Sequence, residues 1–121
     1  MINHSILYTL GKNFGKRIIL LCQFLLDKYE TNRIIFRLVD QLLRCGTSIG
    51  ANISEGQDAV SNADFVNKHA IALKEARETL YWLELLHETN YLNDDEFQSI
   101  YNDCNQLTGS LVNMIKANKN K

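Results

Sequence analysis

Apolar residues recur every three or four positions in four separate stretches of the chain, with polar residues between them. This spacing places the apolar side chains on one face of a helix. It predicts helices over about residues 5–29, 32–55, 62–90 and 94–117. The connections are short, so helices that are neighbours in sequence should pack antiparallel. The pattern therefore predicts an all-α fold: one antiparallel up-down-up-down four-helix bundle that spans residues 1–121 as a single domain.

A largely apolar run, Ile18–Leu26, lies inside the first predicted helix. It contains Gln23 and leads into Asp27 and Lys28 rather than into a small-residue cleavage site, unlike the core of a signal peptide. It is also shorter than the roughly 20 residues that a membrane-spanning helix needs. We therefore expect a buried helix segment in a cytoplasmic protein that has no membrane partner.

Capping residues mark two of the predicted helix starts, and a glycine marks one helix end. Ser61 opens the third helix, where its side-chain oxygen can accept from an early backbone amide, and Asp64 follows at the capping-box position. Asn93 and Glu96 repeat this signal at the start of the fourth helix. Gly56 stands at the end of the second helix, where glycine would tolerate a left-handed conformation at no steric cost.

Composition and charge narrow the class of protein. The 121 residues include no proline, which suits a chain that is helical nearly throughout, and three separated cysteines, which give no disulfide framework. Residues 1–54 carry seven basic and three acidic side chains, whereas residues 55–115 carry three basic and eleven acidic ones. Either the helices have differently charged solvated faces, or a basic face of one copy meets an acidic face of the next.

Small residues four positions apart are the most unusual local feature. Gly11 and Gly15 form one such pair on the first helix, and Gly46 and Gly50, continued by Ser54, form another on the second. A glycine inside a helix costs about 1 kcal/mol relative to alanine, so these pairs need a reason. The missing side chains let another backbone approach closely. That backbone belongs either to the other helix of the same bundle or to another subunit.

A line of polar side chains runs along the second predicted helix, beside its apolar stripe. Arg44, Ser48, Asn52 and Glu55 follow at steps of four, four and three, and therefore share one helical face. Glu78 on the third helix could pair with Arg44 or hydrogen-bond to Asn52, if the two helices are neighbours at that height. Three interpretations are open: an internal network that fixes helix register, a polar contact between subunits, or a contact to a ligand or RNA.

Patterns for catalysis are weak. Glu84 and His87 have the Glu-x-x-His spacing of di-iron bundles, but such sites need a second motif and two further inward glutamates. The cysteines lie too far apart for a zinc pattern, and nucleophile motifs and phosphate-binding glycine loops are absent. His69, on an apolar stripe, is expected to be a packing residue with satisfied hydrogen bonds. We predict no enzyme, no catalytic or metal site, no cofactor and no small-molecule substrate.

The segment Arg44–Gly56, followed by Asp64-Phe65 and Glu78-Thr79, resembles the bacterial four-helix-bundle proteins encoded in intervening sequences of 23S ribosomal RNA genes. The family pattern is an Arg, then Ser-Ile, Ala-Asn-Ile and Glu-Gly on the second helix, with Glu-Thr on the third. The resemblance spans nearly the whole chain. Two departures are a missing proline between the first two helices and the variant stretch Lys74–Leu83 in the third.

The resemblance implies a homo-oligomer, a pentameric ring of up-down bundles, and implies no enzyme. Our leading hypothesis is a non-catalytic interaction protein that binds itself and acts on RNA or another protein. A related group of similar fold, the accessory proteins of diversity-generating retroelements, gives the alternative of a nucleic-acid-binding partner of a reverse transcriptase. The candidate nucleic-acid contacts are the basic residues of the first two helices, namely Lys12, Lys16, Arg17, Arg33 and Arg37.

Overall fold

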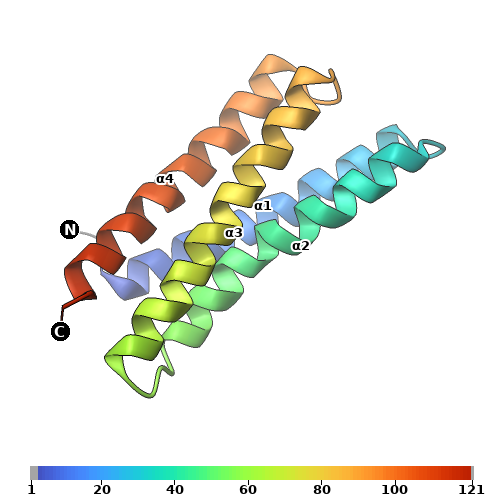
Figure 1. The fold of residues 1–121 in the computed structure, drawn as a ribbon. Helices are drawn as coiled ribbons and strands as arrows, with labels where there is room; N and C mark the ends of the chain where they lie inside the picture. Colours follow the sequence, from blue (N-terminus) through green and yellow to red (C-terminus); the bar gives the residue numbers. More distant parts are fainter. Residues whose placement is uncertain (1–2, 121) are drawn as a thin grey trace.

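The computed structural model describes residues 3–120, which form four long helices joined by short loops. In chain order they are α1 (His4–Lys28), α2 (Arg33–Gly56), α3 (Asn62–Glu88) and α4 (Asp94–Asn118). Each helix packs against the one before it, and α4 returns beside α1 (Figure 1). The predicted all-α, up-down-up-down four-helix bundle is confirmed.

Side-chain caps account for where each helix begins. The cap residues are Asn3, Asn32, Ser61 and Asn93, and each accepts a hydrogen bond from an amide of the first turn. At Asn93 the side chain of Glu96 also accepts from the cap's backbone amide, which completes a capping box. Such caps contribute about 1 kcal/mol each, because the first amides of a helix have no partner within it. The starts expected at Ser61 and Asn93 are confirmed.

The α3–α4 loop shows why α3 ends at Glu88 rather than at residue 90. Asn90 has a backbone φ of 68°, in the left-handed region that commonly ends a helix and that asparagine tolerates. The chain turns back there, and the amides of Tyr91 and Leu92 both donate to the carbonyl of Leu86. This turn buries Leu92, which is 1% exposed, within the core cluster.

The core is a continuous apolar cluster to which all four helices contribute. Its largest fully buried apolar members are Leu7, Ile18, Leu25, Ile35, Leu42, Ile49, Ile53, Leu83, Leu86, Leu92 and Leu111. Full burial of an aliphatic side chain of this size contributes about 1.5–3 kcal/mol. The buried set repeats at three- and four-residue intervals along each helix, so the hydrophobic pattern fixes the inward faces.

One expectation about burial is wrong. The run Ile18–Leu26 is not buried throughout, because Ile19, Leu20 and Phe24 remain 52%, 69% and 41% exposed. Within this run, only Ile18, Cys22 and Leu25 are buried. The reason is that α2 and α4 cover α1 on two sides only, so its outer side meets solvent. Among residues 3–120, no helix has the length and apolar character that a membrane crossing requires.

Gly56 does not adopt the left-handed conformation that its position would tolerate. Asn90 has the only positive φ within residues 3–120, and Gly56 closes α2 in regular helix. Its role is steric: a Cβ atom at this position would lie 2.7 Å from Cε1 of the His69 side chain. Only glycine therefore lets this imidazole of α3 approach the α2 backbone so closely.

The two helical hairpins, α1–α2 and α3–α4, converge at the end that holds both termini and diverge toward their own loops (Figure 1). Accordingly, α1 and α4 make the sparsest contact of the neighbouring helix pairs. Tyr29 and Tyr91 bridge the diverging loops with an edge-on contact of 4.9 Å between ring centroids, and Asn32 donates to the Tyr91 hydroxyl at 3.1 Å. The seam between α1 and α4 is therefore the open side of the bundle.

Glycines allow the close packing of α1 on α2. A Cβ atom added at Gly50 would lie 3.0 Å from the carbonyl oxygen of Gly11, and one added at Gly11 would lie 3.2 Å from Cα of Gly50. The two backbones thus touch with no side chain between them. Gly46 plays a similar part, since a Cβ there would lie 2.8 Å from two carbons of the fully buried Ile18. A Cβ at Gly15 would meet no atom within 4 Å.

Replacement of Gly50 by alanine tests this close approach. The added methyl group meets backbone atoms, which cannot rotate away. We expect Gly50→Ala to lower the free energy of unfolding by about 1–3 kcal/mol, despite the better helix propensity of alanine. Gly109→Ala is the matched control, because this α4 position has open space around it and should gain about 1 kcal/mol. Urea unfolding followed by circular dichroism measures both, and equal stability of the two variants would contradict the backbone contact.

Candidate functional site

Arg44 is the centre of a polar cluster between α2 and α3. Its guanidinium pairs with Glu78, lies 3.3 Å from Oε2 of Glu75, and donates to Gln41 one turn earlier. Glu78 in turn accepts from the indole N–H of Trp82 at 3.1 Å. Of the two partners that the sequence left open for Glu78, Arg44 and Asn52, the structure shows Arg44. This ion pair connects α2 to α3.

This cluster orients the helices more than it stabilises them. The Arg44 side chain is 51% exposed, and ion pairs between exposed groups contribute little because water screens them. A planar guanidinium that meets two carboxylates of the neighbouring helix nevertheless restricts how far one helix can slide along the other. We interpret the cluster as a contact that fixes the register of α2 and α3.

The other residues of the predicted polar line make separate, local contacts. Asn52 is 9% exposed, and its amide donates to the carbonyl and the hydroxyl of Ser48, 2.9 and 3.1 Å away within α2. Glu55, near the end of α2, accepts from Lys68 of α3 at 3.4 Å. The structure thus brings Arg44 and Glu78 together. Ser48 and Asn52 contact each other, and Glu55 contacts Lys68, so the line does not form one network.

Small residues line a groove on the outer face of α1 and α2, which we call the α1–α2 groove. Its volume is about 290 Å³, and its lining residues are Tyr8, Gly11, Lys12, Gly15, Lys16, Ile19, Thr47, Gly50, Ala51 and Ser54. The predicted small residues therefore divide into two groups. Gly11, Gly46 and Gly50 pack α1 on α2, whereas Gly15 and Ser54 leave open space at the surface.

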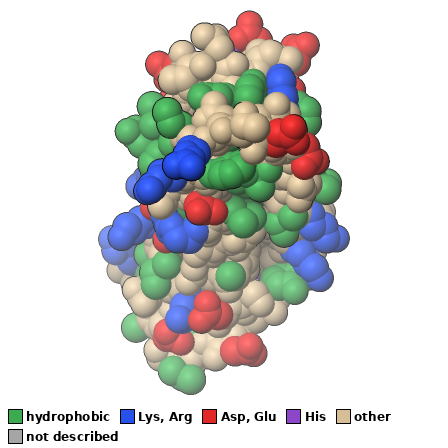
Figure 2. Space-filling model, turned by 90° about the vertical axis from the view of Figure 1, so that its right-hand side faces the viewer, with side chains coloured by type: hydrophobic (Ala, Val, Ile, Leu, Met, Phe, Trp, Pro, Cys, Tyr) green, Lys and Arg blue, Asp and Glu red, His purple; other side chains and the backbone are tan. Residues whose placement is uncertain are grey.

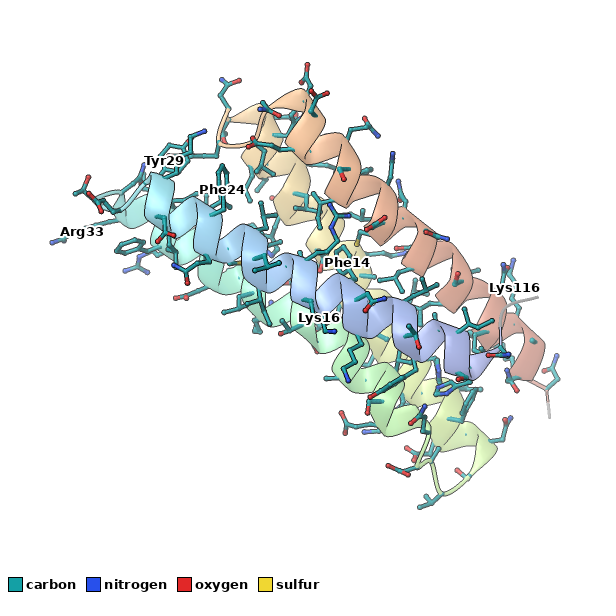
Figure 3. All side chains as sticks on the ribbon, turned by 180° about the vertical axis from the view of Figure 1, so that it is seen from behind. Phe14, Lys16, Phe24, Tyr29, Arg33 and Lys116 are labelled. Carbon is teal, nitrogen blue, oxygen red and sulfur yellow. The ribbon has the colours of Figure 1, made fainter. Side chains whose placement is uncertain are left out.

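A second hollow, the α1–α4 cleft, lies along the open seam. Its volume is about 410 Å³, and it is lined by Arg17, Leu20, Leu21, Phe24, Glu96, Ser99 and Ile100. Figure 3 shows Phe24 pointing from α1 toward the side of α4. The sequence signal for this cleft is the run Ile18–Leu26, which is apolar on every side of the helix and so has no single inward face.

Arg17 bridges the same seam. Its guanidinium pairs with Asp103 of α4 and donates to the hydroxyl of Ser99 at 2.9 Å. It also lines a smaller hollow of about 220 Å³ on the other side of this bridge. Arg17 therefore connects α1 to α4 across the sparse contact, and Asp103 of α4 pairs with its charge.

The five basic residues predicted as nucleic-acid contacts do not form one surface. Lys12 and Lys16 lie one turn apart at the α1–α2 groove, whereas Arg33 and Arg37 begin α2 at the tip of the same hairpin (Figure 3). Arg17 faces α4 instead. Figure 2 shows basic, acidic and hydrophobic side chains interspersed on the face that it views. Only Lys12 and Lys16 among the five line the α1–α2 groove.

The Glu-x-x-His motif is engaged in contacts at the α3–α4 end of the bundle. Glu84 accepts from the hydroxyl of Tyr101, and His87 lies 2.7 Å from a carboxylate oxygen of Asp94. In the part of the chain that the structure describes, no group of three or more His, Cys, Asp or Glu side chains is placed to hold a metal ion. Burial raises the pKa of the Cys22 thiol to about 12, which keeps it protonated at neutral pH.

Comparison with known proteins assigns the chain to a family. The family described as "23S rRNA-intervening sequence protein" matches residues 4–113. A search of curated proteins found no match. Among solved structures, the chain is similar to a crystal structure of a protein of unknown function from the S23 ribosomal protein family of Bacteroides thetaiotaomicron. The two share 42% sequence identity and a TM-score of 0.88, over 95% of this chain and 99% of that one.

The family match runs from the start of α1 into α4 and includes the whole of the Arg44–Gly56 segment. Neither the family description nor that of the similar structure names a catalytic activity. The resemblance carried by Arg44–Gly56 and by Glu78-Thr79 is therefore confirmed. The chain belongs to the 23S rRNA-intervening sequence protein family.

Proposed function

We propose that this protein is a cytoplasmic, non-catalytic interaction protein that assembles with copies of itself. The observation that carries the proposal is the apolar outer side of α1, where Ile19, Leu20 and Phe24 are 52%, 69% and 41% exposed. A helix that is apolar on all sides is normally buried on all sides. Single exposed apolar residues are common on protein surfaces, but here three large ones lie close together on one helix.

One surface that supports assembly is the α1–α2 groove. Ile19 lines it, and the exposed Phe36 and Leu43 extend it along α2. Phe36 and Leu43 lie fourteen and seven residues before Gly50, which is also in the groove, so the three share one face of the helix. Small residues in the groove, such as Gly15, let a helix of another copy approach the backbone closely.

The other surface is the α1–α4 cleft, where Leu20 and Phe24 lie open. The groove and the cleft are different surfaces on two sides of α1. A contact between the groove of one copy and the cleft of the next is therefore heterologous, and such contacts repeat around a ring or along a filament. The closed ring agrees with the pentamer that the family resemblance implies.

The charges beside the two surfaces are complementary. Lys12 and Lys16 line the groove, whereas Glu96 lines the cleft and Asp95 precedes it in the first turn of α4. Arg17 also lines the cleft, but its charge is paired with Asp103. Opposite charges around an apolar centre steer two copies together and disfavour pairing of like surfaces. A contact of this kind would use both the basic excess in residues 1–54 and the acidic excess in residues 55–115.

The polar residues of α2 support a structural role rather than a catalytic one. Arg44 is engaged by Glu75 and Glu78, and Asn52 by Ser48, so these groups already hold contacts within the bundle. The three cysteines are free and buried, which suits a reducing compartment such as the cytoplasm.

Substitution of Leu20 by lysine tests the assembly. Because Leu20 is 69% exposed in the single subunit, its fold should tolerate the charge, whereas an apolar contact with another copy should not. We expect sedimentation velocity to show the wild-type protein as an oligomer, and Leu20→Lys to raise the dissociation constant at least about tenfold. Val60→Lys is the matched control, since Val60 is a loop residue, 92% exposed, outside both surfaces.

Two outcomes would contradict the proposal. One is a wild-type protein that sediments as a monomer at micromolar concentration. The other is a Leu20→Lys variant that assembles as well as Val60→Lys.

A second candidate function is binding of RNA or other single-stranded nucleic acid, and the position of Lys12 and Lys16 favours it. Both are exposed beside the α1–α2 groove, and Nζ of Lys12 lies 6.0 Å from the ring centroid of Tyr8. Basic and aromatic side chains along one groove are what single-strand-binding surfaces use. The same surface would serve an RNA-associated protein or a nucleic-acid-binding accessory protein of a retroelement reverse transcriptase.

Fluorescence anisotropy with a short labelled single-stranded RNA tests this candidate. The double variant Lys12→Gln, Lys16→Gln should bind more weakly and lower the slope of log affinity against log salt by about 0.7 for each phosphate that a lysine no longer neutralises. Lys74→Gln with Arg77→Gln, two exposed basic residues of α3, is the control of equal charge change. Absence of binding by the wild-type protein at low salt would remove this function and leave the assembly proposal standing.

A further inference from the structure

Two histidines meet at the end of the bundle where the termini lie. His4 is in the first turn of α1 and His69 is about two turns into α3, and their ring centroids are 5.0 Å apart in an edge-on arrangement. The ring of Phe65 completes the cluster, with its centroid 4.2 Å from that of His69 and 5.5 Å from that of His4. The cluster joins α1 to α3, which are diagonal to each other in the bundle.

The hydrogen bond of His69 shows which ring nitrogen carries the proton in the neutral imidazole. Nδ1 lies 2.7 Å from the carbonyl oxygen of Phe65. A carbonyl oxygen only accepts, so Nδ1 carries the proton and donates, and Nε2 is left with a lone pair. The His69 side chain is 0% exposed, and Nε2 has no hydrogen-bond partner in the described part of the chain. The expectation that this histidine would be fully satisfied is therefore wrong.

His4 connects the same cluster to the end of α2. The backbone of Ile53 is close enough to its ring to raise the pKa of His4, against the lowering effects of burial and of His69. The carbonyl of Ile53 does not receive the amide of Gln57, its regular helical partner, because that amide donates to Ser54 instead. Nε2 of His4 is also buried without a partner among residues 3–120. His4 lines an open hollow of about 490 Å³ at this end, so protons reach the cluster from solvent.

Among residues 3–120, no hydrogen bond or ion pair joins either ring to a carboxylate. The charged residues nearest to this end along the chain are Lys12 on α1, Glu55 on α2, Asp58 in the following loop, Asp64 and Lys68 on α3, and Lys116 and Lys119 at the end of α4. Glu55 pairs with Lys68, and Asp64 accepts from the amide of Val60. Gly56 blocks any retreat of the His69 ring toward α2, since its backbone lies against that ring.

We propose that His4 and His69 form an acid-sensitive clasp, which holds the first turns of α1 against α2 and α3 while both rings are neutral and releases them when a ring is protonated. A charged imidazolium in the closed cluster would face another imidazole, a backbone and an aromatic ring. Release of the first turns of α1 exposes both rings to water, where the charge is solvated.

The direction of the pH dependence follows from the cluster. Burial lowers the pKa of His4 below its ordinary value of 6.5, and the charge of His69 lowers it further. Burial likewise lowers the pKa of His69. The closed state therefore binds fewer protons than the released state, so the clasp is at full strength above pH 6.5 and weakens as the pH falls below it. For each histidine involved, release becomes easier by at most about tenfold per pH unit below that value.

Amide hydrogen exchange followed by NMR between pH 7.5 and 5.5 tests the clasp in the full-length protein. After correction for intrinsic exchange rates, protection of the amides of Leu7–Gly11 should be constant above pH 6.5. It should then fall by pH 5.5, by up to about tenfold for one histidine and up to about a hundredfold for two. Amides of Cys104–Thr108, in the middle of α4, serve as the internal reference and should not change in this way.

Each histidine is tested by its own variant. His69→Phe and His4→Phe keep an aromatic ring in the cluster and should each remove part of the acid response. Either variant suffices if the other does not fold. His87→Gln removes the remaining histidine, which lies at the opposite end of the bundle, and should leave the response intact. Protection of α1 that is independent of pH, or a response that survives in both phenylalanine variants or disappears in His87→Gln, would overturn the clasp.

Discussion

The contact between the backbones of Gly11 and Gly50 sets the geometry on which the rest of the bundle depends. With no side chain between them, α1 and α2 pack as a tight hairpin, and Gly46 leaves room for Ile18 beside this contact. On its other side, α1 meets α4 only sparsely, so the seam stays open and forms the α1–α4 cleft. The exposed apolar side of α1 follows from this asymmetry, because residues 3–120 form no further helix that could cover it.

The helices and their caps could be predicted from the sequence because both arise from neighbours along the chain. The period of apolar residues fixes the inward faces, and Ser61 and Asn93 mark the helix starts. The candidate site depends instead on contacts between distant residues. Arg17 and Asp103 are 86 positions apart, and neither local sequence selects the other. The need for glycine at position 56 follows from the close approach of the His69 ring, which the sequence does not reveal. Because apolar residues dominate the run Ile18–Leu26, its pattern does not show which of them are exposed.

The surfaces of the bundle are of two kinds. Between α2 and α3, charged side chains such as Arg44 and Glu78 meet each other and hold the helices in register. On both sides of α1, largely apolar hollows lie open, one lined by Lys12 and Lys16 and the other by Glu96 and by Arg17, which pairs with Asp103. The similar structure from Bacteroides thetaiotaomicron shares the four-helix frame at a TM-score of 0.88.

If another copy of the chain covers the apolar side of α1, as we propose, the protein is an oligomer in solution. Native mass spectrometry of the wild-type protein at micromolar concentration and moderate ionic strength measures this directly. Since the chain has a mass of 13.9 kDa, we expect one dominant species at an integer multiple of that mass, with the fivefold multiple expected for a pentameric ring. A dominant species of 13.9 kDa under these conditions would contradict it.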